Sequence, residues 1–132
     1  MSLPSHTLEI RVRYSECDPM GVAHHSAYPV WFEIGRTELL RHSRGINYRD
    51  LEARGILLAV VKLEVRYKLP ARYDDVLELR TRLANAGHVK IEHEYELLRD
   101  SIVLATGSTT LACLGRNGRP QPLPLELAGG DG

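Results

Sequence analysis

The segment YSECDPMGVAHHSAYPVWFEIGRTELLRH, residues 14–42, decides the fold, because the spacing of its side chains changes from strand-like to helical. Ahead of it, apolar and charged residues alternate over residues 7–14, which predicts a half-buried strand. Residues 18–21, Asp-Pro-Met-Gly, are typical of a turn. Residues 26–42 place the only Trp and the only Phe of the chain on one helical face, so this helix is predicted to be central and buried.

The two signals at the start of this helix disagree. Ser26 suits an N-cap, and Pro29 is tolerated only in the first turn of a helix. Pro29 also disfavours helical geometry at Tyr28, so the first helical residue stays open. Gly45 predicts the end of the helix.

The rest of the chain predicts a second, short helix followed by strands. Residues 48–54 form the short helix, and Gly55 ends it. Alternating apolar and polar residues predict three strands, and a more apolar run predicts a fourth; these are residues 57–69, 76–83, 89–97 and 102–114. We expect one domain over residues 1–132, with an extended or frayed tail from about residue 120. The class is α+β, an antiparallel sheet wrapped on one buried helix.

The composition of the chain argues against several classes of function. The 132 residues are 43% hydrophobic and 26% charged, with 17 basic and 17 acidic residues, so no basic excess suggests nucleic acid. Cys17 and Cys113 are too few for a disulfide framework, and we interpret them as reduced thiols of a cytoplasmic protein. The first residues do not show the charged segment followed by an apolar segment that is typical of a signal peptide, so none is expected. The longest apolar run, residues 56–61, is far shorter than the ~20 residues of a membrane span.

Asp18 is the first candidate for chemistry. The sequence has no Gly-x-Ser-x-Gly elbow, phosphate-binding loop or dinucleotide fingerprint, so carboxylates, histidines and backbone dipoles remain. A carboxylate that attacks or activates water, facing the N–H groups of a helix start, is a minimal acyl-transfer site. Gly21 permits a backbone path that brings the turn near the helix. The alternative is a turn aspartate that only caps local N–H groups.

Two histidines and a tyrosine flank Asp18. His24 and His25, with Glu33 further on, lack the i, i+4 spacing of a helical metal site, so we expect no metal. One histidine suits a general acid or a substrate-positioning group, although surface histidines before a helix remain an alternative. Tyr14 either packs its ring, bonds a substrate or holds the acid in place.

These residues resemble a known family, the hotdog-fold acyl-CoA thioesterases of the 4-hydroxybenzoyl-CoA thioesterase type, and its YbgC-like branch in particular. The resemblance is carried by residues 11–41, 65–79 and 105–124, which together span most of the chain in the family's order. It implies a curved antiparallel sheet around the long helix, and dimers whose sheets join edge to edge. In many members two such dimers form a homotetramer.

The resemblance also implies roles for single residues. Asp18 corresponds to the catalytic acid, His25 to the helix-start residue whose backbone N–H polarises the thioester carbonyl, and Tyr14 to a tyrosine that orients the acid. His24 and Pro29 depart from the branch and bear on acyl-chain preference. Coenzyme A belongs to the substrate, and no separate cofactor is expected. The implied substrate-binding residues are Gly21, Tyr28, Val60 and Lys62.

We therefore expect an acyl-CoA thioesterase that works as a homo-oligomer, a dimer or a dimer of dimers. Its site is expected between subunits, completed by a partner's residues around Val60 to Lys62. Whether Asp18 acts as nucleophile or as general base stays open. The alternative is a non-catalytic hotdog module that binds acyl-CoA or a protein. A hotdog hydratase is a weaker alternative, because its Asp/His pair within the helix region is not found here.

Overall fold

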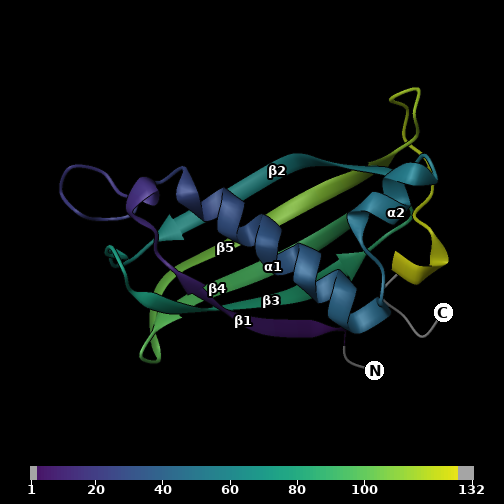
Figure 1. The fold of residues 1–132 in the computed structure, drawn as a ribbon. Coiled ribbons are helices and arrows are strands. Elements are labelled where there is room, and N and C mark those ends of the chain that lie inside the picture. Colours follow the sequence, from purple (N-terminus) through teal and green to yellow (C-terminus); the bar gives the residue numbers. More distant parts are fainter. Residues whose placement is uncertain (1–2, 128–132) are drawn as a thin grey trace.

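In the computed structural model, which describes residues 3–127, one long helix lies across one face of a five-stranded antiparallel sheet (Figure 1). The sheet order is β1-β3-β4-β5-β2, so β1 and β2 form its edges. The arrangement confirms the predicted α+β fold, a curved sheet around one central helix. The strands are β1 (Ser5–Arg11), β2 (Leu57–Tyr67), β3 (Val76–Ala86), β4 (Lys90–Arg99) and β5 (Ile102–Leu114). The helices are α1 (Ala27–Arg44) and α2 (Tyr48–Ala53), with short 3-10 turns η1 (Tyr14–Glu16) and η2 (Leu125–Leu127).

Aromatic packing seats α1 on the sheet. Trp31 and Phe32 are fully buried, as their apolar spacing predicts. The Phe32 ring stacks on Tyr95 of β4 with ring centroids 4.2 Å apart. Gly107 of β5 lies directly beneath this ring, where an added Cβ would come within 2.6 Å of Phe32 Cζ. The helix therefore packs closely against the middle of the sheet, and its amino end is held in a fixed place.

The start of α1 resolves the disagreement between its two signals. The helix begins at Ala27, which places Pro29 in the first turn, where no intrahelical N–H is needed. Ser26 occupies the N-cap position, but the predicted side-chain cap is wrong, because its Oγ lies against His24 Nδ1 and makes no hydrogen bond to the helix N–H groups. Tyr28 is helical although a proline follows it. Its buried ring packs 4.9 Å from the rings of both Trp31 and Tyr67, and this packing offsets the local backbone preference.

Two predicted carboxyl ends of strands are wrong by three residues, those of β1 and β3; the ends of β2 and β4, predicted at residues 69 and 97, are wrong by two. β1 ends at Arg11 rather than at residue 14, because a capping box between Arg13 and Glu16 turns the chain into η1. β3 runs on to Ala86 rather than ending at residue 83, because the register shift between Leu83 and Asn85 lets the pairing with β4 continue. Neither a bulge nor a local cap alters the apolar alternation from which strands are predicted.

The segment after β5 docks back onto the fold. Gln121 N–H donates to the Cys113 carbonyl at 2.9 Å, and Leu123 N–H donates to the His88 carbonyl at 2.8 Å. Leu127 in η2 is buried. The predicted extended tail is thus packed up to this point, and residues 128–132 lie outside the described part of the chain.

Candidate active site

A tight hairpin carries Asp18 and leads directly into α1. Its two arms pair through His24 N–H, which donates to the Glu16 carbonyl at 2.7 Å, and through Asp18 N–H, which donates to the Val22 carbonyl at 2.9 Å. Gly21 N–H closes the turn onto the Asp18 carbonyl at 2.9 Å, and its φ of 80° is the left-handed geometry that favours glycine. The predicted turn is therefore the tip of a hairpin whose returning arm becomes the start of the helix.

The two oxygens of the Asp18 carboxylate have different surroundings. Oδ1 accepts hydrogen bonds from Met20 N–H at 2.9 Å and from Val22 N–H at 3.4 Å. The local capping role considered from the sequence is therefore correct for this oxygen. Oδ2 accepts no hydrogen bond from any residue within 3–127. A half-buried carboxylate held by one oxygen leaves the other open to a water molecule or a substrate.

The N–H of His25 is a free donor at the start of α1. The carbonyl of the same peptide group, that of His24, accepts Ala27 N–H at 3.0 Å, which polarises the group. The next carbonyl, that of His25, accepts Tyr28 N–H at 3.4 Å and the Tyr67 hydroxyl at 3.5 Å. His25 N–H itself has no partner among the described residues. It lies where the helix dipole favours negative charge.

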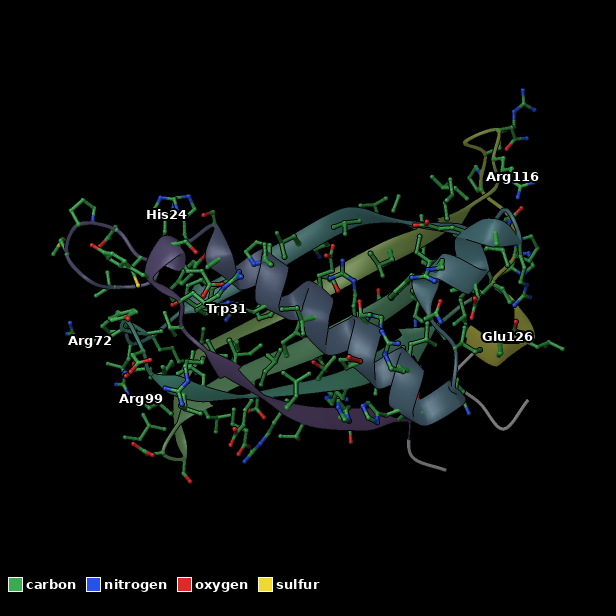
Figure 2. All side chains as sticks on the ribbon, viewed as in Figure 1. His24, Trp31, Arg72, Arg99, Arg116 and Glu126 are labelled. Carbon is green, nitrogen blue, oxygen red and sulfur yellow. The ribbon has the colours of Figure 1, made fainter. Side chains whose placement is uncertain are left out.

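The two histidine rings have different surroundings. They lie against each other with centroids 4.0 Å apart, at the amino end of α1, where Figure 2 labels His24. His24 Nδ1 accepts Ser26 N–H at 3.2 Å and lies 2.8 Å from Ser26 Oγ. The neutral His24 ring therefore carries its proton on Nε2. His24 braces the turn, whereas the exposed His25 ring is available to a substrate.

Tyr14 does not have the surroundings that its predicted role would suggest. Its side chain is 77% exposed and its ring packs against Tyr73, with centroids 5.5 Å apart. Its hydroxyl has no hydrogen bond in the part of the chain that the structure describes. A role in orienting Asp18 therefore stays a prediction.

The predicted substrate-binding residues fall into two groups. Gly21 forms the hairpin turn, and the buried Tyr28 hydrogen-bonds the backbone of Ala71, so both support the site. Val60 and Lys62 lie on β2, and Val60 is about 23 Å along the strand from Tyr67, the β2 residue that contacts the His25 carbonyl. These two residues do not reach the site of their own chain.

Glu16 is a residue of the site that the sequence did not single out. Its side chain is 8% exposed and accepts three hydrogen bonds: from Arg13 N–H at 2.7 Å, from Arg13 Nη2 at 3.1 Å and from Trp31 Nε1 at 2.8 Å. Burial opposes its ionisation, but the hydrogen bonds from Arg13 and Trp31 outweigh this and lower the pKa of Glu16. The sequence signal that pointed to such a residue was the predicted burial of Trp31, because a buried indole N–H needs an acceptor.

A loop between β2 and β3 supports the hairpin from one side. Ala23 N–H donates to the Ala71 carbonyl at 2.7 Å. Asp75 accepts Arg72 N–H at 2.8 Å and Arg99 Nη1 at 2.7 Å. Burial opposes ionisation of Asp75, but these donors lower its pKa. The hairpin is thus fixed on the side away from the helix, in the region that Arg72 and Arg99 mark in Figure 2.

Two other chemistries have definite requirements at this hairpin: a cysteine nucleophile needs a low thiol pKa, and a metal site needs clustered ligands. Burial, followed by the nearby carboxylates of Glu16, Asp18 and Asp75, raises the pKa of the Cys17 thiol. This disfavours a thiolate nucleophile at Cys17. Over residues 3–127, His, Cys, Asp and Glu side chains form no group of three that could hold a metal ion. No helix in the same range is long and apolar enough to cross a membrane.

Comparisons with known proteins bear on the family and the fold of this chain. Residues 12–129 match the model of the thioesterase-like superfamily. The chain is 31% identical over 120 residues to the acyl-CoA thioesterase YbgC of Haemophilus influenzae, covering 89% of this chain and 88% of that protein. A DHNA-CoA thioesterase from Staphylococcus aureus superposes with a TM-score of 0.84 at 31% identity, over 92% of this chain and 81% of the other. A hypothetical protein from Thermus thermophilus gives 0.87 at 37% identity, over 92% and 93%.

Proposed function

The chain belongs to the thioesterase-like superfamily, and on that premise we propose that it hydrolyses acyl-CoA thioesters at the hairpin between η1 and α1. The observation that carries the proposal is that two polar groups without a hydrogen-bond partner among residues 3–127 lie on this hairpin and at the helix start that follows it. These are a carboxylate oxygen of Asp18 and the N–H of His25. The first suits attack or activation of water, and the second suits a developing oxyanion.

The proposed reaction begins with the thioester carbonyl oxygen bound to His25 N–H. Either Asp18 Oδ2 attacks the carbonyl carbon, or it takes a proton from a water molecule that attacks. Negative charge moves to the carbonyl oxygen, where the N–H and the helix start stabilise it. Collapse breaks the carbon–sulfur bond, and the CoA thiolate leaves, with the His25 ring placed to protonate it. In the covalent route, water then releases the acyl group from Asp18.

We further propose that the site is completed in a homodimer. β2 is an edge strand, and a long, apolar edge is usually paired or covered in soluble proteins. Antiparallel pairing of two β2 edges about a two-fold axis near Leu63 sets the partner's Val60 opposite Arg66, beside Tyr67 and next to His25, and sets the partner's Lys62 opposite Glu64, further from the site. The large apolar side chains that β2 exposes are Leu57, Val60, Val61, Leu63 and Tyr67.

A direct assay separates catalysis from mere binding. The protein is mixed with a panel of acyl-CoAs and a thiol reagent, and free CoA is followed over time. Multiple turnovers on at least one acyl-CoA are expected. Saturable binding without CoA release would refute the enzyme and favour an acyl-CoA-binding module.

A further inference from the structure

We propose that Glu16 is a positioning residue that sets the Asp18 carboxylate relative to the His25 N–H; this inference rests on the proposed function. Glu16 does not face the substrate. It connects the three parts of the molecule that must keep their places: the end of β1, the hairpin and the body of α1.

The side chain of Glu16 ties the hairpin to the helix. Its Oε2 accepts the Trp31 indole N–H at 2.8 Å, and Trp31 is 1% exposed within the packed part of α1. Its Oε1 accepts the Arg13 backbone N–H at 2.7 Å. One carboxylate therefore bridges the chain just after β1 and the fifth residue of α1, two segments far apart in sequence.

The backbone of Glu16 ties together the two reactive groups. Its carbonyl accepts His24 N–H at 2.7 Å, one residue before His25, and Asp18 follows Glu16 by two residues. A change in the orientation of Glu16 therefore shifts the Asp18 carboxylate and the His25 N–H relative to α1. Because a misplacement of about 1 Å can lower a rate ~10²-fold, a small loosening here is expected to appear in kcat.

The contacts of Glu16 require a carboxylate of this length. Both of its oxygens face N–H donors, so the amide nitrogen of Gln in Glu16→Gln would face another donor and leave it unpaired. In Glu16→Asp the charge stays, but the side chain is one methylene shorter and cannot bridge Arg13 and Trp31 together. Glu16→Gln therefore tests the charge of the bridge at unchanged length, and Glu16→Asp tests its length at unchanged charge.

The experiment compares kcat and KM for acyl-CoA hydrolysis in the full-length parent, Glu16→Gln and Glu16→Asp. Both variants are expected to lose roughly tenfold to a hundredfold in kcat with KM within about twofold. Glu126→Gln is the matched control, because it removes a 2.6 Å ion pair with Arg54 at the opposite end of the molecule, far from Trp31 in Figure 2. This control should keep the parent's kcat.

A second readout does not depend on activity. Trp31 is the only Trp of the chain, so its indole N–H gives a single resonance in a ¹⁵N–¹H spectrum. In folded Glu16→Gln this resonance and the His25 amide resonance should both shift. An unchanged His25 amide, an unchanged kcat, or a loss confined to KM would overturn the inference. If the parent releases no CoA, the proposed function fails, and the His25 amide alone decides the role of Glu16.

Discussion

Lowering the pH from 7 to 5 is expected to weaken the fold through His93 on β4. His93 is 4% exposed, and its Nδ1 is buried without a hydrogen-bond partner. Burial, and after it the charge of the buried Arg36 on α1, lower the pKa of His93 from 6.5 to about 4. In the folded protein the ring is therefore neutral throughout this pH range.

The sign and size of the effect follow from this difference. The unfolded chain binds a proton at His93 more readily, so the free energy of unfolding falls as pH drops through 6.5 and levels off below 4. The whole difference corresponds to about 3 kcal/mol. About 2 kcal/mol of it is lost between pH 7 and pH 5, before most carboxylates titrate.

Urea unfolding at the two pH values measures this loss. The parent should lose about 2 kcal/mol between pH 7 and pH 5. His93→Gln removes the titrating group, so it should lose much less, whatever its stability at pH 7. His88→Gln replaces an exposed histidine and should behave like the parent. Equal losses in the parent and in His93→Gln would refute the reasoning.

Three further predictions test the packing, the oxyanion donor and the dimer. Gly107→Ala should lower the free energy of unfolding by about 1–3 kcal/mol, because the new Cβ would meet the Phe32 ring, whereas Gly87→Ala meets only an ordinary 3.7 Å contact and should change it little; equal urea midpoints would contradict this. His25→Ala should lower kcat by at most about a hundredfold, because the backbone N–H remains; complete loss of activity would mean that the imidazole ring of His25 contributes more to the reaction than its backbone N–H. Leu63→Glu should shift the protein to monomers in sedimentation and lower activity; a fully active monomer would exclude a shared site.

The sequence was most informative where one residue type repeats at a fixed spacing. The apolar face of α1, the alternation in β2 to β4 and the more apolar run of β5 predicted the fold, because the burial pattern is a property of each element by itself. The early end of β1 was missed, since it depends on a side-chain bond between Arg13 and Glu16 that no periodicity reveals.

The candidate site was only partly visible from the sequence. Asp18 and His25 lie close in sequence, so a turn followed by a helix was enough to suggest both. Glu16 was missed because its main partner, Trp31, is fifteen residues away and meets it only after α1 packs on the sheet. Val60 could not be assigned within one chain, because its proposed contact is with a second copy.

Replacing one atom tests the central proposal most directly. Asp18→Asn keeps Oδ1, which accepts the Met20 and Val22 N–H groups, and exchanges Oδ2 for an amide nitrogen. The hairpin should therefore persist, with a thermal midpoint within a few degrees of the parent's, about 1 kcal/mol or less. The kcat for acyl-CoA hydrolysis should fall by roughly 10²–10⁴. A folded Asp18→Asn variant that hydrolyses acyl-CoA as fast as the parent would contradict the assignment of the site.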